Sequence, residues 1–443
     1  MSSGVLVIGG GFAGLAAAVR LCELGMSVTL IERRRFLGGR AYSFIDPQTG
    51  DTVDNGQHLF MGCYRHTITF LDKIGSLDRL SFQDRTRVDF LDRTNGLVSF
   101  DCPPLPSPLN LAVGIMGLKG LTARDKLHAL KVGLAIRSNG KSQVAANAAG
   151  LTVAEWLDSL GQSRNIKDRF WYPMAIATLN ENPEIASASM LGVVLREGFG
   201  GDSASARMGI SRVGLSDLYT DNARKFIESH GGTVRFANPV QELLIENGRV
   251  RSAILKGGEQ IEADYIISAV THRALQDMLP ASLREGEFAR LNMLNSSPIV
   301  SINLWFDRPV IDREFVGLLG TRVQWLFNKD LIIKGSRASN HIAMIISAAH
   351  DFIDWSKTEL TGLAKQELNE LLPETGSASL LHATVVKEPE ATLSHTVLSD
   401  RIRPGPRTSI PNLILAGDWT ATGLPATIES AVLSGHVAAE LIG

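Results

Sequence analysis

Four residues near the start of the chain have the types and spacing that bind a dinucleotide pyrophosphate. Gly9, Gly11 and Gly14 form a G-x-G-x-x-G pattern, and Glu32 follows the last glycine by 18 positions. In this pattern the first glycine allows a tight turn, the second lets the backbone approach the pyrophosphate, and the third lets a helix pack close to a strand. The later carboxylate accepts hydrogen bonds from the adenosine ribose. The spacing therefore predicts a dinucleotide site.

The segments around these residues have the periodicity needed to position them. Residues 5–8 and 27–31 are apolar, β-branched runs typical of buried parallel strands, and residues 15–22 have helical spacing between them. The free N–H groups of a helix that begins at Phe12 and Ala13 would face the phosphates. This order predicts an α/β fold, but it does not distinguish NAD from FAD.

Two further segments favour FAD. Gly38, Gly39 and Arg40 follow the second strand, and the guanidinium of Arg40 can form charge-assisted hydrogen bonds to a pyrophosphate. Near the C-terminus an apolar run ends in Gly417 and Asp418, and a helical pattern follows. An NAD dehydrogenase does not need that second helix, and the resemblance of both segments to those of the flavin-dependent amine oxidase superfamily implies non-covalent FAD as the cofactor.

The same segments resemble those of the flavin-dependent amine oxidase superfamily. In that superfamily the aspartate at the position of Asp418 holds the ribityl chain and the phosphate region. The helix that follows points its N-terminus at the flavin pyrimidine, where negative charge collects on reduction. The resemblance implies that Gly417, Thr427 and Ile428 contact the flavin there.

A block in the middle of the chain, residues 231–270, resembles the adenine-side segment of the same superfamily. Its pattern predicts a strand, a hairpin with a turn near Gly257 and Gly258, and a returning strand at residues 263–270. The resemblance places Val240 of this block beside the adenosine.

Residues 54–64 resemble the plant-type phytoene and ζ-carotene desaturases, which carry a G-x-H-x-F-x-G-x-Y run beside the flavin. The resemblance implies flavin contacts from four residues of this run, namely Gly56, Gln57, His58 and Leu59.

The middle of the chain narrows the resemblance to the squalene-associated branch, the hydroxysqualene dehydroxylases of hopanoid biosynthesis. The motifs that carry it are Phe170-Trp171-Tyr172-Pro173, Leu179-Asn180, Pro183-Glu184, Ala186-Ser187-Ala188 and Leu195-Arg196-Glu197-Gly198-Phe199. The resemblance implies a long isoprenoid lipid as substrate and the reduction of hydroxysqualene to squalene, with loss of water and oxidation of reduced FAD.

That reaction needs a proton donor, because the leaving hydroxyl must be protonated as the cation-like carbon accepts hydride. His58 is the first candidate, since its motif runs beside the flavin in the resembled desaturases. The alternative is that His58 only hydrogen-bonds the flavin or a backbone carbonyl. We predict that His58→Ala retains FAD and slows turnover.

Four other residues are weaker candidates for the acid. Tyr64 and Tyr172 are expected to pack in half-buried sites. Glu181 and Glu184 flank a proline-containing turn, where a surface or capping role is expected.

The flavin-binding segments lie at both ends and in the middle of the chain. We therefore expect a discontinuous Rossmann-type FAD-binding domain with a parallel sheet, interleaved with an α+β substrate domain. The expected parts of the FAD-binding domain are residues 1–85, 212–272 and 401–443, and those of the substrate domain are 86–211 and 273–400. Because no second G-x-G-x-x-G unit is visible, we expect an external electron donor such as NAD(P)H or a reductase.

One stretch of the substrate domain, residues 103–137, combines apolar and basic side chains. Between positions 119 and 137, five lysines and arginines face one acid, Asp125, which gives a local charge of +4. An apolar body with a basic flank is typical of a helix on an anionic membrane surface. An ordinary amphipathic helix packed on the domain fits the pattern equally well.

Composition excludes several other classes of protein. The 443 residues carry 44 basic and 46 acidic side chains, so the chain as a whole lacks the excess of positive charge typical of nucleic-acid-binding proteins. The three cysteines show no metal-ligand spacing, and their odd number favours a reducing compartment such as the cytoplasm. No apolar run is long enough for a membrane-spanning helix, so we expect a soluble protein or one on the inner face of the cytoplasmic membrane.

Three alternative functions are left open by the residues. A carotenoid desaturase has nearly the same flavin motifs. An amine oxidase is disfavoured because Leu424, and not a tyrosine of an aromatic amine cage, precedes Pro425. A flavin-binding redox sensor without turnover would need an output module or a partner-facing thiol, and none stands out.

Overall fold

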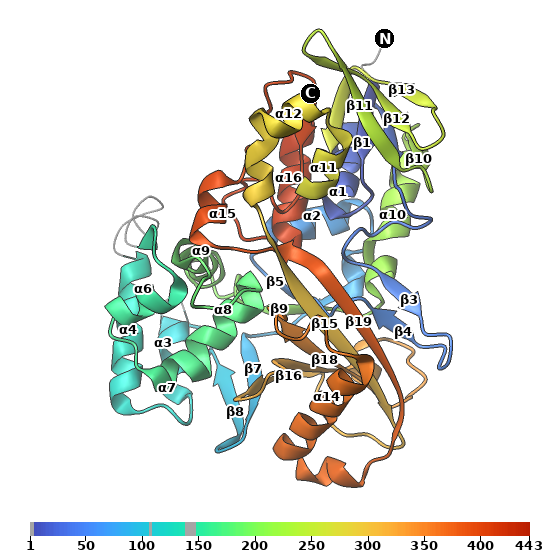
Figure 1. Ribbon diagram of the computed structural model, residues 1–443. Coiled ribbons are helices and arrows are strands. Elements are labelled where there is room, and N and C mark those ends of the chain that lie inside the picture. Colours follow the sequence, from blue (N-terminus) through green and yellow to red (C-terminus); the bar gives the residue numbers. More distant parts are fainter. Residues whose placement is uncertain (1–3, 106–108, 138–147) are drawn as a thin grey trace.

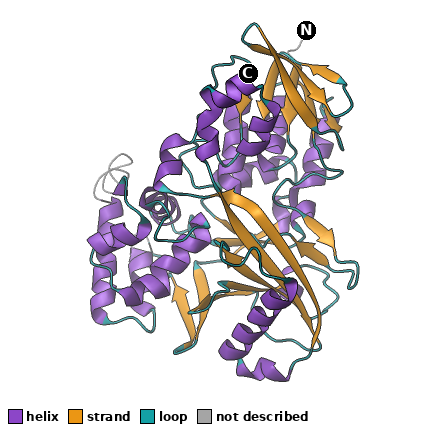
Figure 2. Cartoon of the chain, in the orientation of Figure 1, coloured by secondary structure: helices purple, strands orange, loops and turns teal. Residues whose placement is uncertain are grey.

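The computed structural model describes residues 4–105, 109–137 and 148–443 (Figure 1). The chain forms two large sheets with helices packed on them, and a lobe built almost entirely of helices lies beside them (Figure 2). The flavin-related segments of the sequence belong mainly to the first sheet and its helices.

The first sheet is five-stranded and parallel throughout, in the order β10-β2-β1-β14-β20. Its strands are β1 (Gly4–Ile8), β2 (Ser27–Ile31), β10 (Thr233–Arg235), β14 (Tyr265–Ser268) and β20 (Leu413–Leu415). They come from three separate stretches of the chain, so the sheet forms only when both ends and the middle of the sequence meet. This is the discontinuous, Rossmann-type arrangement that the sequence predicts.

Three helices pack together on this sheet, namely α1 (Phe12–Glu23), α10 (Leu215–Ser229) and α16 (Ile428–Glu440). Figure 1 shows the blue α1 beside the red α16. The two helices approach closely because small residues face each other, and a Cβ added to Gly435 would lie 2.3 Å from the carbonyl oxygen of Ala13. Small residues in α1 and α16 thus hold the two ends of the chain together.

The second sheet has seven strands in the order β19-β15-β18-β17-β16-β7-β8. Its strands are β7 (Arg87–Asp92), β8 (Gly96–Asp101), β15 (Ser296–Phe306), β16 (Phe315–Leu319), β17 (Trp325–Asn328), β18 (His341–Ser347) and β19 (Leu380–Leu393). Val300 and Leu304 pack on the side covered by α14 (Lys357–Leu371). Because side chains alternate along a strand, Ile299 and Ser301 face the other side of the sheet.

The helical lobe lies at the left in Figure 1 and has its own core of aromatic and aliphatic side chains, among them Trp156, Phe170 and Trp171. Its helices are α3 (Leu109–Gly117), α4 (Ala123–Arg137), α6 (Val153–Ser159), α7 (Arg164–Ile166), α8 (Tyr172–Leu179) and α9 (Ala188–Phe199), with a π-helical turn at Lys167–Trp171.

Shorter elements connect these regions. The strands are β3 (Ser43–Ile45), β4 (Thr52–Asp54), β5 (Leu59–Met61), β6 (Leu80–Phe82), β9 (Met208–Ser211), β11 (Val240–Glu246), β12 (Arg249–Leu255) and β13 (Gln260–Glu262). The helices are α2 (Arg65–Lys73), α11 (His272–Met278), α12 (Ala281–Glu285), α13 (Lys329–Ile332) and α15 (Val397–Ile402). Three 3₁₀ turns lie at Leu77–Arg79, Glu287–Met293 and Pro373–Ser377.

The adenine-side block contains one more turn than the sequence predicts. A first hairpin joins β11 to β12 through Asn247 and Gly248, whose φ angles of 51° and 73° are left-handed. The predicted turn at Gly257 and Gly258 follows and leads into β13. Asn and Gly both tolerate positive φ, and this is the signal that the sequence interpretation missed. The domain boundaries stay a prediction.

Among the helices that the structure describes, none is both long enough and apolar enough to cross a membrane.

Candidate active site

The glycine pattern forms the turn between β1 and α1. Gly9 has a φ of 111°, and a Cβ added to it would lie 2.8 Å from the carbonyl oxygen of Ala269. A Cβ on Gly14 would lie 1.8 Å from the carbonyl oxygen of Gly9. Gly11 is the N-cap of α1 and offers no side chain to the first turn. The N–H groups at the start of this helix are therefore open to a bound anion.

The predicted second phosphate segment lies directly against the first. The N–H of Gly38 donates to the carbonyl oxygen of Gly10 at 2.9 Å. Gly39 has a φ of 57°, and a Cβ added to it would lie 3.0 Å from the Cα of Gly11. Two glycine backbones and an uncapped helix N-terminus thus converge at one place, and this arrangement fits the pyrophosphate of FAD.

The adenine-side residues also meet. Glu32 is buried, and its two carboxylate oxygens accept from the N–H groups of Gly10 and Arg34, both at 2.8 Å. The N–H of Asn238 donates to the Glu32 carbonyl oxygen at 3.1 Å, which brings the start of β11 and the half-buried Val240 close to Glu32. The structure therefore brings together the two residues predicted at the adenosine.

Arg40 and Asp418, predicted separately at the phosphate and ribityl regions, form a salt bridge with each other. Arg40 also donates to the carbonyl oxygen of Ala391 at 3.2 Å. Its side chain is 32% exposed, whereas that of Asp418 is 7% exposed. Asp418 therefore holds the guanidinium near the glycine turns, where it can contact a pyrophosphate.

Arg403 organises the loop that carries Asp418, and the sequence interpretation missed it. The buried guanidinium donates to the carbonyl oxygens of Asp418 at 2.7 Å and Leu424 at 2.8 Å. It also donates to those of Trp419 and Thr420. Burial lowers the pKa of Arg403 from its ordinary value, but an arginine stays protonated at neutral pH. A sequence motif could not identify Arg403, because its guanidinium binds only backbone carbonyl oxygens.

The N-terminus of α16 is fixed by its own cap and by a buried acid. The hydroxyl of Thr427 accepts from the N–H of Ser430 at 3.3 Å, and Ile428 is the first helical residue. Glu429 is buried and accepts from the N–H groups of His66 at 2.9 Å and Thr67 at 2.8 Å. The carboxylate thereby joins α16 to the N-terminus of α2, a favourable place for an anion.

The predicted flavin-side run from Gly56 to Leu59 follows β4 and leads into β5, of which Leu59 is the first residue. Gly56 is buried, while Gln57, His58 and Leu59 are half-buried. The Oε1 of Gln57 accepts from the Nζ of Lys329 at 2.7 Å. Leu59 packs on the side of the seven-stranded sheet away from α14. The run therefore joins the FAD-binding segments to the second sheet.

Comparison with known proteins identifies the family. The family described as flavin containing amine oxidoreductase matches this chain over residues 12–443. The chain belongs to the flavin containing amine oxidoreductase family. The predicted FAD cofactor and oxidoreductase activity are therefore confirmed.

Individual members of the family agree with this assignment. A hydroxysqualene dehydroxylase from Rhodopseudomonas palustris is 30% identical, and the match covers 100% of this chain and 99% of that protein. A 15-cis-phytoene desaturase from Glycine max is 27% identical, and the match covers 99% of this chain and 79% of that protein. The predicted resemblance to the hydroxysqualene dehydroxylases is confirmed.

A solved structure confirms the fold class. An oxidoreductase from Methanosarcina mazei superimposes with a TM-score of 0.75 at 17% identity, covering 99% of this chain and 100% of that one. At this identity the likeness supports the fold alone.

The surroundings of His58, the predicted proton donor of this flavoenzyme, disfavour its protonated form. Burial lowers the pKa of its imidazole, and the nearby carboxylate of Asp54 offsets only part of that effect. Proton donation by His58 and the flavin-contact alternative both stay predictions.

The two tyrosine candidates occupy packed sites. Burial raises the pKa of Tyr64, and a hydrogen bond with Thr427 offsets part of the effect. Tyr172 is 8% exposed, and the side chains of Arg164 and Lys167 lie over its ring. Both arrangements agree with the packing roles expected for these residues.

The two glutamates of the proline-containing turn differ from each other. Glu184 is exposed, as expected. Glu181 is 0% exposed, so the expected surface or capping role is wrong for this residue. The turn folds inward between α8 and α9, and long-range partners bind the carboxylate of Glu181.

An apolar cluster borders the flavin-side run on the second sheet. Half-buried Leu59 and Trp325 pack on the buried side chains of Phe327 and Ile345. Trp325 also packs on the core of the helical lobe. Apolar side chains therefore continue from the lobe to the residue beside His58.

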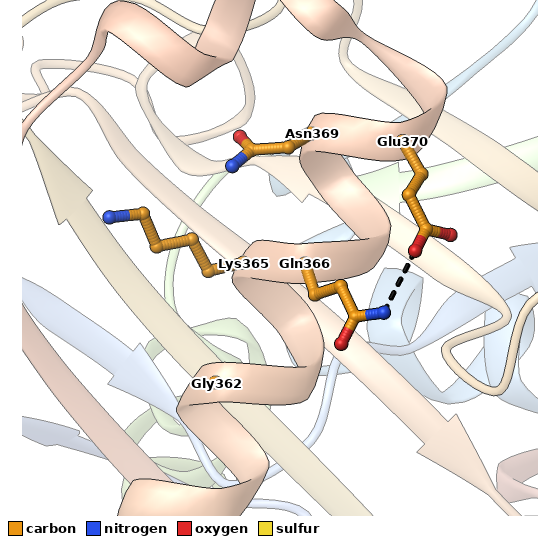
Figure 3. A pocket seen from close by; sticks show the side chains of 5 residues that line it. All are labelled: Gly362, Lys365, Gln366, Asn369 and Glu370. Atoms are coloured by element: carbon orange, nitrogen blue, oxygen red, sulfur yellow. Dashed lines mark hydrogen bonds between the residues drawn. The ribbon is translucent and has the colours of Figure 1, made fainter.

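A shallow hollow elsewhere on the surface carries no comparable chemistry. It is lined by Gly362, Lys365, Gln366, Asn369 and Glu370 of α14, and in Figure 3 these side chains all come from one helix. Gln366 donates to Glu370 at 2.8 Å. Because α14 covers the opposite side of the second sheet from Leu59, none of the predicted flavin residues reaches this hollow.

Proposed function

We propose that this flavoenzyme reduces hydroxysqualene to squalene, with loss of water and oxidation of reduced FAD. The observation that carries the proposal is the match at 30% identity to a protein named hydroxysqualene dehydroxylase over 99% of that protein's length. The branch motifs in the middle of the chain add to it. The apolar cluster around Trp325 and Leu59 suits an isoprenoid chain better than a cationic amine.

Bound FAD, when reduced, supplies a hydride to the substrate carbon. The chain's own residues have three tasks. Gly11, Gly39 and Arg40 bind the pyrophosphate, and the apolar cluster excludes water from the reacting carbon. A positioned acid must also protonate the leaving hydroxyl. The electrons come from NAD(P)H or a reductase as an external partner.

A carotenoid desaturase is the second candidate function. The observation in its favour is the match at 27% identity to a 15-cis-phytoene desaturase over 99% of this chain. One flavin site supports hydride flow in either direction, so the same residues would serve an oxidation.

One substrate panel distinguishes the two functions. Chemically reduced enzyme is mixed anaerobically with hydroxysqualene, and oxidised enzyme is mixed with phytoene, ζ-carotene and polyamines, all in detergent or vesicles. Squalene formed from the first mixture, with no product from the others, is the expected result. Conversion of phytoene alone would exclude the proposed reaction.

We also propose that α3 and α4 contact an anionic membrane and admit the lipid substrate there. The described residues include 16 exposed large hydrophobic side chains, and seven of these lie between positions 105 and 134. They are Leu105, Leu109, Val113, Met116, Leu127, Leu130 and Leu134. Residues 106–108 and the side chain of Arg137, parts of the predicted segment, lie outside what the structure describes.

The exposed charged side chains of the same surface are basic. Lys119, Arg124 and Lys131 are exposed. Asp125, the one acid of the segment, is 4% exposed and bonds to Ser163 and Asn165. Its negative charge therefore faces the protein and not the solvent, and the exposed charges complement an anionic leaflet. The inner face of the cytoplasmic membrane is the location that we propose.

A further inference from the structure

A buried carboxylate and a histidine form a pair where the helical lobe meets the second sheet. Glu181 follows α8, and His350 follows the end of β18. The Oε1 of Glu181 lies 3.0 Å from the Nε2 of His350. The side chain of Glu181 is 0% exposed, whereas that of His350 is 44% exposed. Glu181 is therefore enclosed by the protein, whereas His350 is accessible to solvent.

The hydrogen bonds around Glu181 fix the direction of the imidazole. Its Oε1 also accepts from the N–H of Asn182 at 2.9 Å, and its Oε2 accepts from the hydroxyl of Ser394. A carboxylate that receives these donors is an acceptor only, so the Nε2 of His350 carries the hydrogen of the shared bond. The Nδ1 of His350 makes no hydrogen bond to any described residue, and it is the ring atom free to exchange a proton.

The pair also lies close to residues of the flavin site. Ser394, which donates to Glu181, precedes His395. The Nε2 of His395 accepts from the N–H of Ala426, the residue before the Thr427 cap of α16. Two hydrogen bonds and the peptide link between Ser394 and His395 therefore connect Glu181 to the residue before the N-terminal cap of α16.

On the other side, the pair reaches the apolar cluster. The hydroxyl of Ser297 lies 3.3 Å from the Nε2 of His350. Ser297 and Ile299 are alternate residues of β15, and Ile299 packs in the apolar cluster with Leu59. Ser297 therefore links His350 to the strand whose Ile299 packs in the apolar cluster.

We propose that His350 is the acid that protonates the leaving hydroxyl, with Glu181 as its positioning residue; this inference rests on the proposed function. The proton on Nδ1 passes to the hydroxyl oxygen, and the C–O bond breaks with its electron pair on that oxygen, which leaves as water. The carbon then gains the electron pair of a hydride from the reduced flavin. The carboxylate behind the imidazole holds the ring in a fixed orientation for the transfer.

His350 suits this role better than His58. Burial lowers the pKa of His58, and no carboxylate bonds to its ring among the described residues. His350 has a carboxylate as hydrogen-bond partner, and its 44% exposed side chain is accessible to water that can replace the donated proton. The two histidines therefore differ in their hydrogen-bond partners, and this difference favours His350 as the acid.

The test compares His350→Gln and Glu181→Gln with wild type, as FAD-loaded enzymes. Anaerobic single-turnover reoxidation of the reduced flavin by hydroxysqualene measures the chemical step, and perturbation of the oxidised flavin spectrum measures substrate affinity without turnover. We expect the His350→Gln rate to fall about 100- to 10,000-fold, the range of one general acid, with affinity within about twofold. Glu181→Gln should lose a smaller part of the rate, again with unchanged affinity.

Chemical rescue separates an acid from a structural residue. Added imidazole should restore part of the rate of His350→Ala and have no effect on wild type. His230→Gln, an exposed histidine of the FAD-binding side, is the matched control and should keep the wild-type rate. A wild-type rate in His350→Gln, or no imidazole rescue, would overturn this assignment alone. Wild-type enzyme that hydroxysqualene does not reoxidise would overturn the proposed function itself.

Discussion

Lys329 and Asp54 form a salt bridge with 2.7 Å between Nζ and Oδ2, and their side chains are 3% and 4% exposed. The residues are 275 positions apart in the sequence, so the bridge joins the end of β4 to α13 on the second sheet. Lys329 also donates to Gln57, the residue before His58. The bridge thereby fixes the flavin-side run relative to the sheet that carries the apolar cluster.

Removal of Lys329 is expected to destabilise the protein strongly. Lys329→Met leaves Asp54 as a buried charge without its cation, and loss of one partner of a buried pair costs about 3–5 kcal/mol. We expect the free energy of unfolding to fall by that amount in denaturant titrations of the FAD-loaded enzyme. The double variant Lys329→Met/Asp54→Asn should regain part of the lost free energy of unfolding, because it no longer buries an uncompensated charge. A single variant as stable as wild type would contradict this account of the bridge.

Arg40 is expected to contribute to FAD affinity more than to folding. Arg40→Met removes a cation at the glycine turns and leaves Asp418 there as an uncompensated anion. Hydrogen bonds to charged groups contribute about 1.5–3 kcal/mol, which corresponds to a roughly 10- to 100-fold higher Kd for FAD. Titration of the apoprotein with FAD, followed by flavin fluorescence, measures this Kd. Arg35→Met, an exposed arginine of the same turn, is the control and should bind FAD as wild type does. Equal affinities for the two variants would remove Arg40 from the site.

The flavin-binding half of the site could be predicted because its signals are local. Gly14 is required by its close approach to the carbonyl oxygen of Gly9, and Gly9 has a positive φ of 111°, so G-x-G-x-x-G records both directly. Glu32 ends the next strand of the same βαβ unit. Arg40 and Asp418 are far apart in the sequence, so their spacing gives no sign that they meet. The family resemblance was needed to place both of them at the flavin.

The long-range ion pairs could not be predicted in the same way. Lys329 and Asp54 are 275 positions apart in the sequence, and Glu181 and His350 are 169 positions apart, so only the folded chain brings each pair together. A glutamate beside a proline in a turn is typical of a surface, and only its long-range partners show that Glu181 is buried. Arg403 binds backbone carbonyls, which no side-chain pattern can reveal.

The stability of the protein is expected to fall between pH 7 and pH 5. Burial, with the nearby His66 and Arg20, lowers the pKa of His436 from 6.5 to about 4. Its stabilisation is complete above pH 6.5 and is lost as the pH falls toward 4, because the unfolded chain takes up the proton first. We expect a loss of about 1–2 kcal/mol at pH 5 from this residue.

Variants of two histidines test the origin of that loss. The free energy of unfolding of the FAD-loaded enzyme is measured by denaturant titration at pH 7 and pH 5. His436→Gln should show a smaller difference between the two pH values than wild type. His230→Gln, which alters an exposed ring, should keep the wild-type difference. An unchanged difference in His436→Gln would show that other groups cause the pH dependence.

The surface of α3 and α4 is expected to bind anionic vesicles through both charge and apolar contact. Charge reversal in Lys126→Glu/Lys131→Glu should reduce flotation with vesicles rich in anionic lipid and have little effect with neutral ones, since each basic residue near such a surface contributes about 1 kcal/mol. Leu127→Gln/Leu134→Gln, at side chains 60% and 66% exposed, should reduce binding to both kinds of vesicle. Lys365→Glu on α14 changes the same charge on another face and should float as wild type does. If charge reversal on α4 has no more effect than Lys365→Glu, the exposed leucines belong to an ordinary protein surface and the lipid must enter elsewhere.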